Sequence, residues 1–356
     1  MSGRAVLIVC FFMKRKTTIL VITAALTVLM AFVCLFVGSS NMSIAECFSA
    51  LFGKGSQAGV RIMQNIRLPR VLAAVIAGAG LSVSGLIMQT TLNNSMASPS
   101  TLGITNAAVF GANVSIIAFA GGFLKTGHDA SSFMVGTNPY ATSAVAFIFA
   151  VVSVLLIMGL GRIRSFSPGV LILSGIAMGS VWTAATTILQ FYSTDIGLSA
   201  AVIWSFGDLG RATYETDAIM AAVLVVSIIF FRLMSWKYNA LLSGDETAVS
   251  LGINVKTLRF ISLLMSSLLT AVCVSFLGII GFVGIICPHI SKRLIGNNHR
   301  ISIPLSALTG SLLLLTADTA SRIIGSGSAL PVGAITALLG APFFVALILG
   351  RRKYHA

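Results

Sequence analysis

The chain has 356 residues, of which 56% are hydrophobic and only 9% are charged. Because a soluble domain contains about 25% charged residues, this composition excludes a soluble enzyme and indicates a polytopic membrane protein. The formal net charge of +14 would suit a nucleic-acid-binding protein, but the basic residues lie between apolar runs and not in one arm, so we expect no nucleic-acid partner.

Ten apolar segments follow one another along the chain, and each is a candidate membrane-spanning helix. The first lacks the cleavage site of a secretory signal, so we expect it to be retained. Residues 260–291 contain no charge and are too many for one helix, and their glycines and proline predict two helices joined by a tight turn. The segments occupy residues 17–37, 68–90, 101–122, 139–160, 167–190, 217–236, 258–278, 280–295, 303–323 and 331–350.

The charged residues indicate how these segments are oriented. With the N-terminus in the cytoplasm, the inside segments contain 16 basic and two acidic residues, whereas the outside segments contain seven of each. Because Lys and Arg accumulate in cytoplasmic loops, we predict an all-α membrane protein with ten transmembrane helices and both termini cytoplasmic. Residues 1–16 would be a cytoplasmic N-terminal extension, 17–350 the transmembrane domain and 351–356 a cytoplasmic tail.

The sequence lacks the motifs of several enzyme classes. It contains no G-x-x-x-x-G-K-[ST] phosphate-binding loop and no H-E-x-x-H motif, and its four histidines are scattered. It also has no C-x-x-C pair. We therefore predict no catalytic residue, no metal site and no cofactor on this chain, and an intramembrane enzyme is the least favoured class.

Charged residues stand out at two predicted external helix ends. Arg67 and Arg70 flank the start of the second segment, where the helix dipole is already positive. They either snorkel to the interface or form a basic docking point for an acidic partner. Asp318 and Arg322, near the outer end of the ninth segment, predict an i,i+4 ion pair because an intramembrane carboxylate is normally paired.

Two cytoplasmic connections are also informative. Gln89 precedes an uncharged turn at 92–103, and in a membrane such a residue is either an interhelical contact or part of a polar pathway. In the connection at 239–252, Ser243 and Glu246 predict a capping box, and Gly252 stands where a short helix would end. Such a helix is either a surface anchor or a docking element.

Several motifs, taken in order and spacing, resemble one family over roughly residues 17–352. They are Arg67-Leu68-Pro69-Arg70 with Gly78, Gly85 and Gln89; Ala97-Ser98-Pro99 with Leu102-Gly103; Trp204 with Gly207-Asp208-Leu209; residues 242–252; Gly281-Phe282-Val283-Gly284 with Pro288-His289; Asn298-His299-Arg300; Asp318 with Arg322; Pro331-Val332-Gly333; and Gly340-Ala341-Pro342-Phe343-Phe344. Together they resemble a permease subunit of the iron-chelate and cobalamin (FecCD) family of ATP-binding-cassette importers.

The resemblance implies an assembly in the cytoplasmic membrane of a bacterium or archaeon. The chain would pair with a second permease copy, most simply as a homodimer, and the two copies would enclose a central pathway. Membrane lipid would surround the pair. Two cytoplasmic ATPase subunits would carry ATP and Mg, and an external binding protein would deliver a metal chelate, a ferric siderophore before haem or cobalamin. The alternative is an ion-coupled secondary transporter without an ATPase, for which Asp318 is the candidate acid.

The resemblance also implies roles for particular residues. Arg67, Arg70 and Arg322 match arginines that meet acidic residues of the binding protein. The residues expected to couple to the ATPase are Leu242, Ser243, Gly244, Asp245, Glu246, Ala248, Leu251 and Gly252. The pathway and gate residues would be Gln89, Asn93, Asn94, Ser95, Met96, Ala97 and Asn106. The chain departs from the family at residues 93–97, where Arg-Asn-Pro-Leu-Ala is common, and at Asp208, which adds an external acid.

Overall fold

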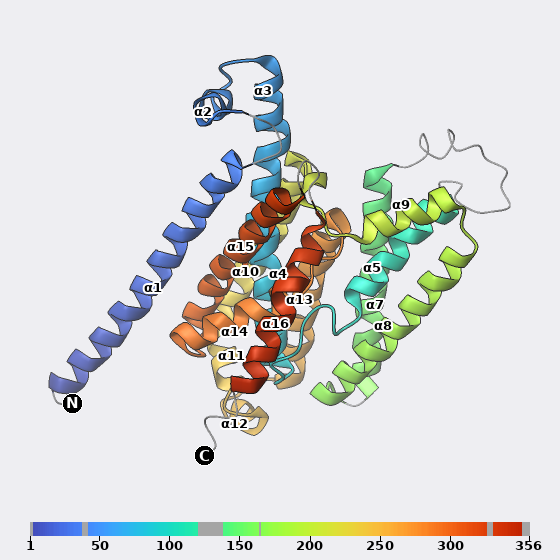
Figure 1. Ribbon diagram of the computed structural model, residues 1–356. Helices are drawn as coiled ribbons and strands as arrows, with labels where there is room; N and C mark the ends of the chain where they lie inside the picture. Colours follow the sequence, from blue (N-terminus) through green and yellow to red (C-terminus); the bar gives the residue numbers. More distant parts are fainter. Residues whose placement is uncertain (1–2, 38–41, 120–137, 164, 326–329, 351–356) are drawn as a thin grey trace.

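The computed structural model describes residues 3–37, 42–119, 138–163, 165–325 and 330–350, and these residues form helices without any β-strand. The predicted tail at 351–356 lies outside the described residues. The elements are α1 (Gly3–Phe36), α2 (Ile44–Leu51), α3 (Gln57–Arg61), the π-helix η1 (Ile62–Arg67), α4 (Leu68–Thr91), α5 (Ile104–Asn113), the π-helix η2 (Val114–Phe119), α7 (Pro139–Ile163), α8 (Pro168–Phe191), α9 (Asp195–Ser205), the 3-10 helix η3 (Leu209–Arg211), α10 (Tyr214–Leu233), α11 (Ser235–Leu241), α12 (Asp245–Ser250), α13 (Val255–Leu277), α14 (Val283–Ile295), α15 (His299–Ile324) and α16 (Val332–Gly350) (Figure 1).

Each of the ten predicted apolar segments coincides with a helix. Seven stretches of the described chain are long and apolar enough to cross a membrane, and the remaining segments fall on α5 with η2, on α14 and on α16. The 13 residues of α14 rise about 20 Å, less than the roughly 30 Å of a bilayer core. The predicted break within 260–291 is present, because α13 ends at Leu277 and the next residue, Gly278, has φ +78°.

Helix α4 forms the centre of the molecule and packs against α10, α13, α14 and α15. Nearly all of its side chains are buried. Two close crossings depend on glycine: a Cβ at Gly78 would collide with the backbone of Gly310 in α15, and one at Gly85 would overlap the carbonyl of Gly284 in α14. Small residues at such crossings let membrane helices approach closely, as the sequence pattern suggests.

The remaining helices flank this centre. Helix α1 lies along α15, and its residues 3–16, predicted as a separate extension, are helical and continuous with the apolar segment (Figure 1). On the other side, α5, α7 and α8 share an apolar core that joins them to α13. Helix α1 begins and α16 ends at the same end of the bundle, where α12 also lies, whereas α2 and α3 lie at the opposite end (Figure 1).

Candidate functional site

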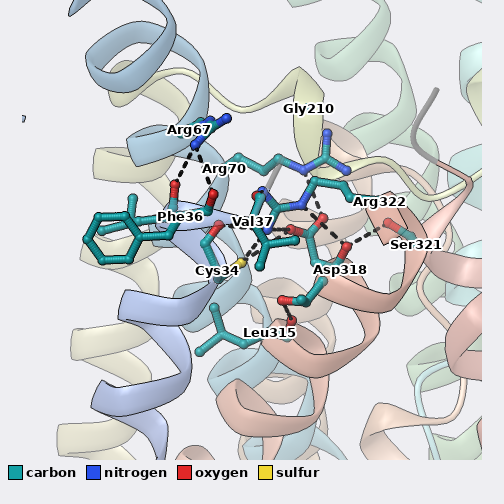
Figure 2. Close-up of polar contacts among 12 residues, drawn as sticks. Cys34, Phe36, Val37, Arg67, Arg70, Gly210, Leu315, Asp318, Ser321 and Arg322 are labelled. Atoms are coloured by element: carbon teal, nitrogen blue, oxygen red, sulfur yellow. Dashed lines mark hydrogen bonds and ion pairs between the residues drawn. The ribbon is translucent and has the colours of Figure 1, made fainter. Parts of the chain in front are cut away.

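Arg67, Arg70 and Arg322, the predicted docking residues, lie together with Asp318 where α1 ends and α4 begins (Figure 2). We call these four residues the arginine cluster. The Asp318 side chain is fully buried and accepts a 2.8 Å hydrogen bond from Arg70 Nε. Arg322 Nη2 lies 3.0 Å from the other carboxylate oxygen of Asp318. One carboxylate of α15 therefore holds guanidinium groups from two helices.

The arginine cluster also caps the end of α1. Arg67 Nη1 donates to the carbonyl oxygens of Leu35 (2.9 Å) and Phe36 (3.3 Å). Arg322 Nη2 donates to the Cys34 carbonyl oxygen at 2.9 Å. The last carbonyls of a helix have no partner within it and carry partial negative charge. Arg67 and Arg322 thus stand at the negative end of α1, whereas Arg70 binds Asp318. These contacts explain the two cations, Arg67 and Arg70, beside the positive end of α4.

The arginine cluster is buried and keeps an excess of positive charge. Arg67 is 5% exposed and Arg70 is 9% exposed, so the structure places these predicted docking residues inside the helix junction. The cluster contains three guanidinium groups and one buried carboxylate, which pairs with Arg70 and Arg322. Asp208, the departure from the family pattern, lies at the rim with its Oδ1 3.8 Å from Arg70 Nη2. Its side chain is 44% exposed.

A second site lies between the 92–103 turn, α5 and α8. Four of the predicted pathway residues, Asn94, Met96, Ala97 and Asn106, line a cavity of about 690 Å³ there, which we call the turn cavity. Its other lining residues are Ser100, Thr101, Ile172, Gly175, Ile176, Gly179, Ser180, Thr183 and Ala184. Hydroxyl, amide and apolar groups make up this lining, and it contains no charged side chain.

Three predicted pathway residues lie outside the turn cavity. Gln89 is buried between α4 and α14, where its Nε2 donates to the Ile285 carbonyl oxygen at 3.3 Å and its Oε1 accepts from Lys292 Nζ at 3.0 Å. It is therefore an interhelical contact. Asn93, with φ +44°, and Ser95 are exposed at the end of α4.

The predicted coupling segment forms α11 and α12, but the capping box at Ser243 is wrong. Gly244, with φ +107°, is the N-cap residue, so α12 begins one residue later at Asp245 and the Ser243 side chain makes no cap. The predicted end is present: Gly252 has φ +77°, and the amides of Gly252 and Ile253 donate to the carbonyls of Val249 and Ala248. These two bonds form a Schellman motif.

The two faces of α12 differ in environment. Ala248 is fully buried in an apolar cluster that also contains Leu86 and Ile87 of α4. Val249 and Leu251 are each 60% exposed. A short helix anchored on one side, with large apolar side chains on the other, is suited to docking on a partner.

Comparison with known proteins shows which family the chain resembles. Residues 26–350 match the model of the FecCD transport family. The chain belongs to the FecCD transport family. It is 44% identical over 340 residues to a putative ABC transporter permease protein of Methanocaldococcus jannaschii, with 96% of both chains covered. It is 36% identical to the hemin transport system permease protein of Yersinia pestis, covering 92% of this chain and 96% of that protein.

A solved structure agrees with this assignment. The fold resembles that of a putative metal-chelate type ABC transporter in an inward-facing conformation, with a TM-score of 0.78 and 28% sequence identity. The match covers 94% of this chain and 99% of the other. This FecCD-family chain is therefore a multi-pass protein of the cell membrane.

Two further charged residues of this FecCD-family chain are buried, although no sequence motif marks them. Asp217, in the first turn of α10, is 3% exposed, and its carboxylate has no hydrogen-bond partner among the described residues. Arg259, in α13, is also 3% exposed. In the sequence, both read only as loop or helix-end charges, and the Arg259 partners Thr91 and Phe166 are distant along the chain.

Proposed function

We propose that this chain is the permease subunit of an ABC importer that moves a metal chelate into the cytoplasm, driven by ATP hydrolysis on a separate subunit. The observation that carries the proposal is the family match over residues 26–350. Relatives named as permeases for hemin, Fe(3+)-citrate and iron(3+)-hydroxamate support an iron chelate. A ferric siderophore is the proposed substrate, ahead of haem and cobalamin.

We further propose ten membrane crossings with both termini in the cytoplasm. The excess of basic residues in the assigned inside segments supports this orientation. The positions of the α1 start, the α16 end and α12 at one end of the bundle fit it as well (Figure 1). The arginine cluster would then lie at the external end of the bundle.

The partners follow from this orientation. Val249 of α12 and Leu251, the residue that follows this helix, are exposed and would dock on a cytoplasmic ATPase. That ATPase would hold ATP and Mg, and two permease copies would pair with two ATPase subunits. This chain would contribute no catalytic group or cofactor. We expect reading frames beside its gene to encode the ATPase and the binding protein.

Uptake from a defined panel tests the proposed substrate. Purified permease, ATPase and binding protein are reconstituted in liposomes and offered a ferric hydroxamate siderophore, haemin or cyanocobalamin. Uptake of the siderophore that requires ATP and binding protein supports the proposal. A preference for haemin or cyanocobalamin would show that the proposed substrate is wrong. Uptake without ATP would contradict the proposal of an ATP-driven importer.

We propose that the positive arginine cluster attracts an acidic binding protein. Replacing Arg67 with glutamine should weaken binding several-fold and flatten its salt dependence, because one charge near the interface is removed. Affinity is measured in nanodiscs at several salt concentrations, and the melting temperature of each variant is measured in parallel. Lys256→Gln, an exposed change in α13 near the α12 end, is the control. Unaltered affinity and salt dependence in folded Arg67→Gln protein would contradict the docking role.

The turn cavity gives a second prediction. Ser180 lines it from α8, so Ser180→Trp should fill it and reduce uptake about tenfold or more, which corresponds to at least 1.4 kcal/mol. Ser180→Ala, which only enlarges the cavity, should transport like the wild type. Equal uptake by both variants would show that the substrate does not pass through this cavity.

A further inference from the structure

Arg259 lies near the start of α13, and its side chain is only 4% exposed. Each of its three nitrogens binds a different cytoplasmic element. Nε donates to the Thr91 carbonyl oxygen at 2.7 Å, and Nη1 donates to the Phe166 carbonyl oxygen at 3.3 Å. Nη2 donates to both carboxylate oxygens of Asp245, at 2.9 and 3.1 Å.

The two carbonyl partners lie just before the two segments, the 92–103 turn and α8, that line much of the turn cavity. Thr91 is the last residue of α4 and leads directly into the 92–103 turn. Phe166 lies in the connection between α7 and α8, two residues before α8 begins at Pro168. Residues of that turn and of α8 line the turn cavity, and we call these two segments its walls. Arg259 is therefore hydrogen-bonded to the residues that lead into both walls.

The third partner belongs to the proposed ATPase-docking helix. Asp245 is the first residue of α12, and its side chain is 53% exposed. The bond to Asp245 is therefore the solvent-accessible contact of Arg259, whereas the bond to Thr91 is buried. A movement of α12 would first shift Asp245 and its bond to Arg259. Because the guanidinium group is rigid and planar, Arg259 would transmit that shift to Thr91 and Phe166, which precede the two walls.

Arginine is the side chain suited to this task. Its planar group presents donors in fixed directions, whereas lysine offers a single ammonium on a flexible stem. Cations near the C-terminal carbonyls of a helix are also favourable, and Thr91 supplies such a carbonyl. The buried cation is satisfied on every nitrogen, as a desolvated charge requires.

We propose that Arg259 is a positioning residue that couples the displacement of α12 to the walls of the turn cavity. The inference rests on the proposed function, because it takes α12 as the ATPase-docking element. It assigns a function to one buried arginine and its partner Asp245, beyond the docking of α12 itself.

A purely structural role for Arg259 makes a different prediction. If Arg259 only stabilises the fold, its loss lowers the amount of folded complex but leaves the uptake per ATP of each folded complex unchanged. A coupling residue changes the number of substrate molecules imported per ATP hydrolysed. The ratio of uptake to ATP hydrolysis, measured on purified complexes, therefore separates the two roles.

The test uses the full complex of permease, ATPase and binding protein in liposomes, with the siderophore, haemin and cyanocobalamin panel as the probe. Asp245→Asn removes the charge of the accessible partner, and Arg259→Gln removes the guanidinium. Arg259→Lys keeps the charge without the three-way geometry. Lys256→Gln removes an exposed charge from the same turn of α13 and serves as the matched control.

We expect Asp245→Asn, Arg259→Gln and Arg259→Lys each to lower uptake per ATP by about fivefold or more, the range of an ordinary coupling free energy. The control should keep the wild-type ratio. Asp245→Asn should add no further loss in the Arg259→Gln background, because both changes break one link.

Two outcomes would overturn these claims separately. Wild-type uptake per ATP in folded Asp245→Asn protein, which loses only a half-exposed carboxylate charge, would overturn the coupling role even if Arg259→Gln fails to fold. A wild-type complex that imports none of the three compounds with ATP would instead overturn the proposed function.

Discussion

Replacing Asp318 with asparagine should destabilise the folded protein by about 3 kcal/mol or more, because it leaves buried guanidinium groups without their counter-charge. Asp318 is fully buried and binds both Arg70 and Arg322. Arg322 also binds the end of α1, as does Arg67 beside the start of α4 (Figure 2). The loss should therefore loosen the junction of three helices, and SDS titration in mixed micelles measures it.

Asp208→Asn is the matched control for this change. Its carboxylate also lies near Arg70, at 3.8 Å, but its side chain is 44% exposed. A solvent-exposed ion pair contributes at most about 1 kcal/mol, so this variant should unfold close to the wild type. Similar unfolding of wild type, Asp318→Asn and Asp208→Asn would show that the buried carboxylate does not hold the junction.

Replacing Gly85 with alanine should have the second large effect. The added Cβ would overlap the Gly284 carbonyl, a backbone atom that cannot rotate away. Helices α4 and α14 would have to separate, and overpacking of this kind costs about 1–3 kcal/mol. The melting temperature in detergent should fall, and uptake should fall with it, because α4 leads to the turn cavity.

The control for this change is a glycine with free space around it. A Cβ at Gly159 in α7 meets no atom within 4 Å, so Gly159→Ala should be neutral or slightly stabilising through the higher helix propensity of alanine. Equal melting shifts for the two alanine variants would mean that the α4–α14 crossing is not tightly packed.

The helices could be predicted from the sequence because apolar length and glycine or proline breaks are local properties. The interruption at Gly278 and the helix end at Gly252 are of this kind, and both are present. The predicted start of α12 is wrong because Gly244 adopts φ +107° and becomes the N-cap residue. The spacing of Ser243 and Glu246 does not reveal this backbone conformation. The π-helices also leave no mark in an apolar pattern.

The sites were less predictable because their partners are far apart in sequence. Arg67 and Arg70 were noticed from charge alone, but their burial depends on where α1 ends. The sequence leaves open whether Gln89 lines a pathway or joins two helices, and its contacts with Ile285 and Lys292 depend on where α14 lies. Arg259 reads as a cytoplasmic charge until the ends of α4 and α7 are placed around it.

The energy source of uptake tests the central claim most directly. The permease and its ATPase are reconstituted in liposomes, and the binding protein delivers the substrate to them. Uptake is measured with and without ATP, and with and without a protonophore. The importer predicts uptake that requires ATP and survives the protonophore. Uptake that continues without ATP and collapses with the proton gradient would contradict it and identify an ion-coupled carrier.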